Sequence, residues 1–194
     1  GYYRADEETF RKITEATGTG DRRHPLAFIL EAADDLAYKT ADIEDAFVKG
    51  FITYSALERE LKTLGEDSAG CAFHPLEKLR QLYERGMSKS VDNPESYAVK
   101  NWIVRAQGFL ISCATYGFTS NYDAIMEGSF GKDLFYGTYG EKLMELLGDM
   151  AYRYVFSSRA IYKMELTESA ILDFLMDRLV RAVLYYDTDV HQDA

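Results

Sequence analysis

The chain has 194 residues, 47% hydrophobic and 14% aromatic, and its 32 acidic and 22 basic side chains give a formal charge of −10. This length suits one sizeable core, so we expect a single domain over residues 1–194. The net negative charge argues against a nucleic-acid partner, because phosphate binding relies on clustered Lys and Arg. The longest nearly uncharged apolar stretch, residues 108–118, is much shorter than the roughly 20 residues of a membrane-spanning helix, so we expect no membrane contact.

The start of the sequence and its cysteines give no sign of export. The chain begins Gly-Tyr-Tyr-Arg, without an initiator Met and without the regions of a signal peptide. Cys71 and Cys113 stand far apart and outside any metal-binding or redox spacing, which is typical of partly buried thiols in a reducing compartment. We therefore expect a cytoplasmic protein, and we expect the sequence to be a piece of a longer chain.

Residues typical of helix starts and helix ends divide the chain into helices. Few runs alternate between apolar and polar residues, as strands would. A first helix is predicted over residues 6–16, ended by the Gly-Thr-Gly of residues 18–20. A second helix is predicted from Pro25, whose missing N–H costs nothing at a first helical position, to Val48. These signals indicate an all-α fold.

Two shorter helices are predicted next. Ser55 with Glu58 forms a capping-box pattern for one of them, and Gly65 is placed to end it. Pro75 and Gly86 bracket the other.

The second half of the chain predicts longer helices. Their ranges are residues 94–116, 138–156 and 169–185. The first of these carries an apolar stripe around Trp102, which favours a central core helix over a base-stacking role for the indole. Residues 118–137 and 187–194 look irregular.

Candidate chemistry lies on the second predicted helix. Asp34, Tyr38 and Asp42 are spaced by four residues, so they share one helix face. The small and apolar neighbours of Asp34 indicate partial burial, and a buried carboxylate requires a cation or a hydrogen-bonding partner. By itself the pattern favours a solvated acidic face on an amphipathic helix, and it also fits a divalent metal held through carboxylate oxygen.

Other polar residues have ordinary structural interpretations beside functional ones. Arg22 and Arg23 precede the second helix, where they either reach the phosphates of a ligand or lie in a common exposed loop. His24 and His74 each precede a Pro, which is typical of helix entry, and His191 lies in the C-terminal tail. We predict no metal role for these histidines.

One segment resembles a known family. The run His-Pro-Leu-Ala-Phe-Ile-Leu-Glu-Ala-Ala-Asp-Asp-Leu-Ala-Tyr over residues 24–38, continuing into residues 40–46, is similar to the deoxyguanosinetriphosphate triphosphohydrolases (dGTPases), which are helical HD-superfamily phosphohydrolases. Similarity extends through residues 105–111 and 154–159 to Phe174. The resemblance implies a multi-helix, HD-domain-like bundle, of which this chain is the C-terminal portion.

The resemblance also implies roles for the three residues on the second helix. In the family a metal is held by a His, a His-Asp pair and a final Asp, and this final position matches Asp34. The family's Tyr that packs against the deoxyribose matches Tyr38, and the acid that hydrogen-bonds the sugar 3′-hydroxyl matches Asp42. The implied cofactor is a divalent metal, Mg²⁺ or Mn²⁺ or else a transition metal. The implied partners are a dNTP, with dGTP favoured, and further copies in a homo-oligomer.

The histidines depart from the family pattern. None of the three is followed by Asp, so the family's His and His-Asp positions have no counterpart in this sequence. We therefore expect the isolated chain to be inactive, and a longer parent to cleave dGTP into deoxyguanosine and triphosphate. The alternative is a non-catalytic helical interaction or regulatory module related to dGTPases.

Overall fold

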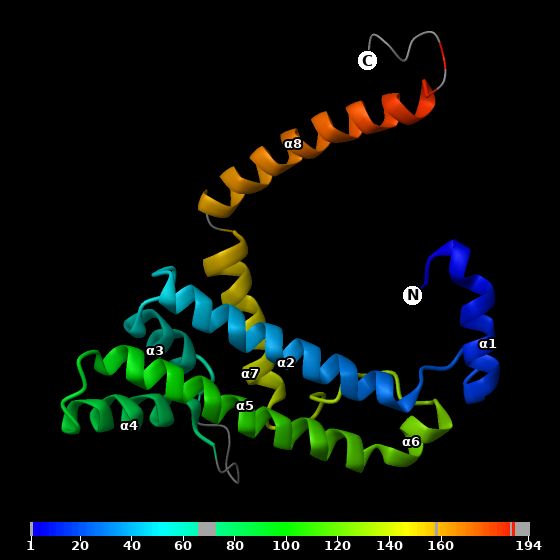
Figure 1. Cartoon of the computed structure of the whole chain (residues 1–194). Coiled ribbons are helices and arrows are strands. Elements are labelled where there is room, and N and C mark those ends of the chain that lie inside the picture. The colour runs from blue at the N-terminus through cyan, green and yellow to red at the C-terminus, as the bar shows by residue number, and fades with distance from the viewer. Residues whose placement is uncertain (1, 66–72, 158, 187, 189–194) are drawn as a thin grey trace. The chain divides into compact units, whose positions relative to one another are not determined.

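Helices form the regular structure of the part that the computed structural model describes, namely residues 2–65, 73–157, 159–186 and 188 (Figure 1). No strand occurs in these ranges, which confirms the all-α fold class. Contacts group the chain into two units, Gly1–Ala151 and Tyr152–Ala194. The expectation of one domain over residues 1–194 stays a prediction.

The first unit contains a short 3-10 turn at Arg4–Asp6 and the helices α1 to α7. The bounds are α1 Glu7–Thr17, α2 Pro25–Val48, α3 Tyr54–Lys62, α4 Pro75–Ser88, α5 Pro94–Ser120, α6 Tyr122–Glu127 and α7 Glu141–Met150. A π-helical turn at Ala151–Phe156 follows, and the second unit contains α8, Arg159–Leu184. None of the described helices is long and apolar enough to cross a membrane.

The core of the first unit lies around α5, which packs against both α2 and α4 (Figure 1). Trp102 on α5 is fully buried, and its indole Nε1 donates a hydrogen bond of 2.8 Å to the carbonyl oxygen of Pro75. A buried indole N–H normally finds such an acceptor. The prediction of a central core helix with Trp102 inside it is therefore confirmed.

Gly117 allows the chain after α6 to approach α5 closely. A Cβ atom added at Gly117 would lie 1.9 Å from the carbonyl oxygen of Leu134, and Leu134 itself is buried. Only a residue without a side chain fits at such a distance. Leu134 can therefore lie this close to α5 because Gly117 has no Cβ atom.

The first two helices were predicted closely. Helix α2 begins at Pro25 and ends at Val48 as expected, and α1 ends before Gly18, which has a positive φ of 69°. His24 is the N-cap of α2, and its Nδ1 accepts a hydrogen bond of 3.1 Å from the backbone N–H of Leu26. The interpretation of His24 as a helix-entry residue is confirmed.

The predicted boundaries of the next two helices were partly wrong. Thr53 caps α3, with its Oγ1 accepting a hydrogen bond of 3.2 Å from the N–H of Ala56, so the capping box at Ser55 does not form. Gly86 lies inside α4 and is buried against α5, where it makes room for Tyr97 and does not end the helix. His74 takes the N-cap position of α4 as expected.

In the second half, two helices run further than their signals suggest, whereas α7 begins at Glu141, three residues after the predicted start at residue 138. Helix α5 continues to Ser120, and the short α6 lies in a stretch predicted to be irregular. Helix α8 begins at Arg159, ten residues before the predicted start at residue 169, and Thr167 lies inside it with Oγ1 donating to the carbonyl of Lys163 at 2.9 Å. Cys113 is buried as expected, whereas Cys71 and His191 lie outside the described residues.

The close approach at Gly117 yields a stability test with a control on the same helix. We expect Gly117→Ala to lower the free energy of unfolding by about 1–3 kcal/mol, because the new methyl group must displace backbone at residue 134. Gly108→Ala meets no atom within 4 Å and should instead raise stability by about 0.5–1 kcal/mol through helix propensity. Urea unfolding of the three proteins measures both changes. Equal effects of the two substitutions would contradict the packing at residue 134.

Candidate functional site

The three residues singled out by spacing lie together on one side of α2. The buried side of this helix carries Phe28, Ala32, Leu36, Thr40, Ile43 and Ala46. Asp34 and Tyr38 are exposed, with 66% of Tyr38 accessible, and Asp42 is half-buried. The burial expected for Asp34 is not observed, because residues two positions apart, such as Ala32 and Asp34, lie on nearly opposite sides of a helix.

The surroundings of Asp34 do not complete a metal site. The neighbouring acid Asp35 pairs with Lys39 at 3.7 Å, and among the described residues no ion pair involves Asp34. Nor do His, Cys, Asp and Glu residues gather in groups of three or more within the described ranges. Because one carboxylate does not hold a divalent ion by itself, the described residues do not fit the complete metal centre that the resemblance implies.

The carboxyl group of Asp42 has a raised pKa. Burial raises the pKa of the Asp42 carboxyl above its ordinary value of 3.8, and the nearby carboxylate of Asp45 raises it further, while Lys49 lowers it. Lys49 is itself engaged with Asp45 at 3.1 Å. The negative charge on Asp42 is therefore poorly compensated, which favours a hydrogen-bond donor or a cation as its neighbour.

A buried hydrogen bond that the sequence patterns did not single out joins this part of α2 to α5. Thr40 is fully buried, and its Oγ1 accepts a hydrogen bond of 2.9 Å from the Nε2 of Gln107 on α5. The same hydroxyl donates to the carbonyl of Leu36 at 2.8 Å. The only sequence signal was a hydroxyl residue within the apolar stripe of α2, which does not identify its partner 67 residues away.

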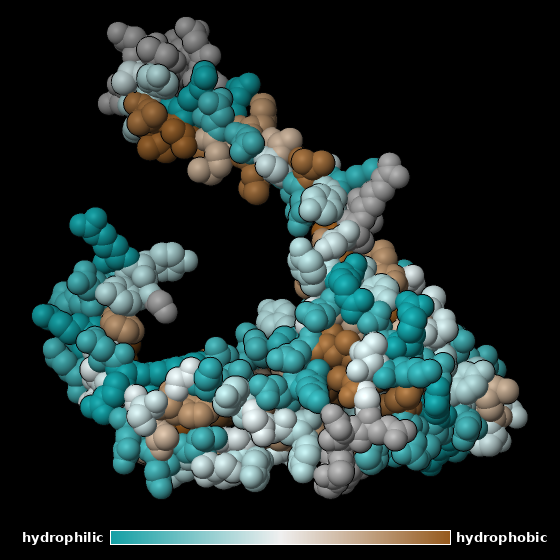
Figure 2. All heavy atoms as spheres, turned by 180° about the vertical axis from the view of Figure 1, so that it is seen from behind, coloured by the Kyte–Doolittle hydropathy of each residue, from teal (hydrophilic) through white to brown (hydrophobic). Residues whose placement is uncertain are grey.

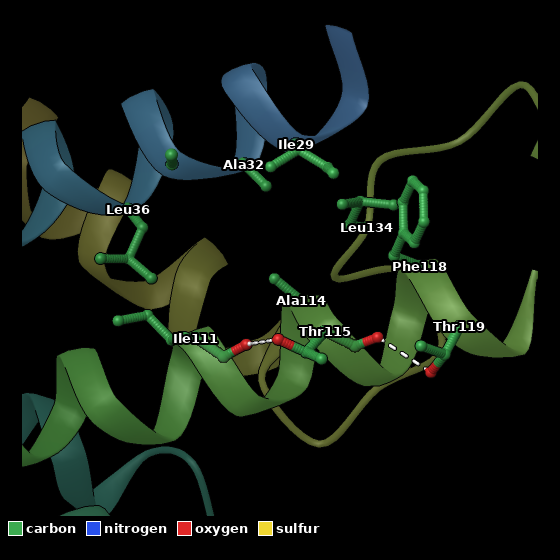
Figure 3. Close-up of a pocket in the computed structure, with 10 residues that line it drawn as sticks. Ile29, Ala32, Leu36, Ile111, Ala114, Thr115, Phe118, Thr119 and Leu134 are labelled. Atoms are coloured by element: carbon green, nitrogen blue, oxygen red, sulfur yellow. Dashed lines mark hydrogen bonds between the residues drawn. The ribbon is translucent and has the colours of Figure 1, made fainter. Parts of the chain in front are cut away.

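An apolar cavity of about 220 Å³ lies between α2 and α5 (Figure 3). Ile29 and Leu36 point into it from α2, Ile111 and Phe118 from α5, and Leu134 closes one end. The lining contains no charged residue. The cavity therefore suits an apolar group and not a phosphate.

The two hydroxyl groups in this cavity are already used by α5. The Oγ1 of Thr115 donates to the carbonyl of Ile111 at 2.8 Å, and that of Thr119 donates to the carbonyl of Thr115 at 2.9 Å (Figure 3). Such bonds to the preceding turn are common for Thr in helices.

The two arginines before α2 contact groups of the fold itself. Arg22 donates to the carbonyl of Glu127 at 2.8 Å, at the C-terminal end of α6. Arg23 pairs with Glu31, and its guanidinium lies 4.3 Å from the centre of the Phe28 ring. These contacts support the structural interpretation of the loop over a phosphate-binding one.

The outer side of α2 is unusually apolar for an exposed surface. Leu26 is 64% exposed and Leu30 is 72% exposed, and the small residues Ala33 and Ala37 are exposed as well. A helix that is apolar on more than one side is normally buried on more than one side. The outer side of α2 therefore has the character of a packing surface, with Asp34 in the middle of it.

Comparisons with known proteins agree with the resemblance. No protein-family model matches the chain. It is 34% identical over 193 residues to the deoxyguanosinetriphosphate triphosphohydrolase-like protein of Listeria monocytogenes, a match that covers 97% of this chain and 40% of the relative. It is 30% identical over 183 residues to the deoxyguanosinetriphosphate triphosphohydrolase of Yersinia enterocolitica, covering 91% of this chain and 35% of that protein.

A further match has the same proportions. The deoxyguanosinetriphosphate triphosphohydrolase of an Enterobacter species is 30% identical over 187 residues, which cover 91% of this chain and 36% of the relative. The chain thus spans about two fifths or less of the length of the curated relatives that it matches. These matches place the chain in the deoxyguanosinetriphosphate triphosphohydrolase family, as the counterpart of that part of its longer relatives.

Proposed function

We propose that the chain is part of a cytoplasmic dNTP triphosphohydrolase that cleaves dGTP into deoxyguanosine and triphosphate. In this enzyme Asp34 supplies one carboxylate ligand to a divalent metal, Tyr38 packs against the deoxyribose, and Asp42 accepts a hydrogen bond from the 3′-hydroxyl. The observation that carries the proposal is the position of the three side chains on one accessible side of α2, in a chain that matches named triphosphohydrolases.

The spacing along α2 suits a nucleotide that lies parallel to the helix. A rise of 1.5 Å per residue separates successive members of the trio by about 6 Å, so Asp34 and Asp42 are about 12 Å apart along the axis. A phosphate near Asp34 and a sugar hydroxyl near Asp42 then place the sugar ring over Tyr38. The exposed ring of Tyr38 offers the flat apolar surface that such packing needs.

The electrostatics of Asp42 support its role as an acceptor. Its carboxyl has a raised pKa because it is partly desolvated and lies near Asp45. A sugar hydroxyl would supply the missing donor without adding charge. The contact would therefore be more favourable than one made by a fully hydrated carboxylate.

Bond cleavage requires groups that the described residues do not contain. The metal, Mg²⁺ or Mn²⁺ or a transition metal, would need ligands in addition to Asp34, and we propose that these come from regions of the longer protein that this chain does not cover. The apolar outer side of α2 supports this proposal, because it is a surface that further protein would bury. The described residues would contribute binding and orientation, and not the cleavage step.

A second candidate function is a non-catalytic interaction or regulatory module related to these enzymes. The observation in its favour is that none of the three histidines is followed by Asp. A module of this kind would keep the fold and its packing surfaces without hydrolysing dGTP.

A chimera tests the proposed role of Asp34. In it, this chain replaces the matching stretch of the Yersinia enterocolitica relative, and HPLC detects deoxyguanosine and triphosphate after incubation of dGTP with Mg²⁺ or Mn²⁺. We expect Asp34→Asn to lower kcat by at least about 100-fold, because even outer-shell changes at metal sites cost about 10–100-fold. Asp35→Asn, a change of the neighbouring acid on the same helix, should retain activity.

The chimera also separates the two candidate functions. Circular dichroism establishes that each variant is folded. Undiminished hydrolysis by a folded Asp34→Asn variant would show that Asp34 is not a ligand. A folded chimera that carries the unaltered chain and fails to hydrolyse any dNTP would favour the non-catalytic module.

Asp42 provides a prediction on stability as well as on binding. A carboxyl with a raised pKa holds its proton more tightly in the folded chain than in the unfolded chain, so its contribution to stability falls as the pH rises above about 3.8 and through the raised value. Asp42→Asn removes this effect, and should stabilise the chain by up to about 0.5 kcal/mol at pH 7. The gain should be smaller at pH 4, and urea unfolding at the two pH values measures it.

The same substitution should weaken substrate binding in the chimera, seen as a higher KM for dGTP. Asp45→Asn is the matched control, since it removes the neighbouring acid and its ion pair with Lys49 but not the proposed sugar contact. If Asp42→Asn destabilised the chain and left KM unchanged, Asp42 would be a structural residue.

A further inference from the structure

Thr40 is a polar side chain in the interior of the first unit. In the view of Figure 2, hydrophilic side chains and side chains of intermediate hydropathy cover most of that unit. Among the residues that the structure describes, Thr40 and Glu60 are the two that are both polar and buried, and the exposed fraction of Thr40 is 0%. A polar group that is removed from water needs hydrogen-bonding partners in the protein. The partners of Thr40 therefore restrict how α2 lies against its neighbours.

The hydroxyl group of Thr40 acts as an acceptor toward α5. Its hydrogen is directed at the preceding turn of α2, where the carbonyl oxygens of Leu36 and Ala37 lie 2.8 and 3.3 Å from Oγ1. The oxygen is left to accept, and the Nε2 of Gln107 donates to it at 2.9 Å. An apolar side chain at position 107 could pack there but could not donate. Gln107 is therefore the residue of α5 that completes the bonding of Thr40.

This hydrogen bond restrains the rotation of α2 about its own axis. The other buried residues of α2, which the structure describes in full, are all apolar: Phe28, Ala32, Leu36, Ile43 and Ala46. Apolar contacts have little directional preference, whereas a hydrogen bond weakens steeply as its distance and angle depart from the optimum. Among the buried residues of α2, Thr40 is thus the one whose contact specifies an angle.

Thr40 lies midway along the helix between the two proposed sugar contacts, Tyr38 and Asp42. Two residues correspond to about 3 Å along the axis and about 200° around it, so both of these side chains lie nearly opposite Thr40. A side chain that reaches about 6 Å from the helix axis moves by about 1 Å when the helix turns by about 10°. A shift of this size greatly weakens a hydrogen bond of ordinary length.

We propose that Gln107 is a positioning residue for the sugar end of the substrate site. By holding Thr40, it fixes the rotation of α2 at which the Asp42 carboxylate reaches the 3′-hydroxyl of the nucleotide and the ring of Tyr38 faces the deoxyribose. Gln107 itself lies on α5, across α2 from these two residues, and contacts no substrate. The inference rests on the proposed function, because it needs Asp42 to accept the hydrogen bond of the 3′-hydroxyl.

A double-mutant cycle on the 194-residue chain tests the hydrogen bond itself. Thr40→Val and Gln107→Met each remove one partner and keep a side chain of similar size. Each should lower the urea concentration at the midpoint of unfolding, because it leaves the other partner without its bond. The double variant should lower the midpoint by clearly less than the sum of the two single effects. Additive effects would mean that the two side chains are not coupled, and would overturn the proposal.

The positioning role is tested in the chimera with the Yersinia enterocolitica relative. The probe is 2′,3′-dideoxyguanosine triphosphate (ddGTP), which lacks the 3′-hydroxyl, and HPLC detection of deoxyguanosine gives the rates. The readout is the inhibition constant of ddGTP divided by the KM for dGTP, which we call the 3′-hydroxyl ratio. Neither constant depends on the amount of folded enzyme, so a variant that only reduces the folded fraction leaves this ratio unchanged.

Gln107→Met and Thr40→Val should each lower the 3′-hydroxyl ratio by about threefold to tenfold, the loss expected when one hydrogen bond to the substrate is misaligned. Thr40→Ser keeps the acceptor oxygen and should retain the ratio within about twofold. The matched control is Asn101→Leu, because Asn101 also lies on α5 and its amide donates at 2.8 Å to the carbonyl of Tyr97 on the same helix. This control should leave the ratio unchanged.

Asp42→Ala separates a failure of this inference from a failure of the proposed function. If Asp42→Ala leaves the 3′-hydroxyl ratio unchanged, Asp42 does not contact the 3′-hydroxyl and the proposed function loses its sugar contact. If Asp42→Ala lowers the ratio and Gln107→Met does not, the sugar contact stands and Gln107 is a structural residue only. An equal drop in the ratio for Asn101→Leu would also overturn the positioning role. A folded, unaltered chimera without activity would overturn both proposals.

Discussion

The packing of α2 against α5 is the constraint on which the candidate site depends. The two helices meet through apolar side chains and through the hydrogen bond between Thr40 and Gln107, which is buried and therefore costly to break. This bond sets the rotation of α2 about its axis. Because Thr40 faces α5, the residues two positions before and after it, Tyr38 and Asp42, are turned toward the outer side.

The outer side of α2 combines features that rarely share a solvent-facing surface. Large apolar residues such as Leu30 lie beside the acids. Asp42 is partly desolvated, and the nearby cation Lys49 is already paired with Asp45. Each feature is unfavourable in an isolated domain, and each becomes favourable when further protein or a ligand covers the helix. A chain that spans about two fifths of the Listeria relative is expected to expose surfaces of this kind.

The sequence by itself determined the helical class, the bounds of α2 and the sharing of one face by Asp34, Tyr38 and Asp42, because helical periodicity and Pro25 are local signals. It did not determine which face was buried. The small neighbours of Asp34 suggested burial, and only the contact with α5 showed that the buried side is the opposite one. Tertiary structure alone also decided the Thr40 to Gln107 bond, because a hydrogen bond between residues distant in sequence depends on how whole helices pack, which no local pattern encodes.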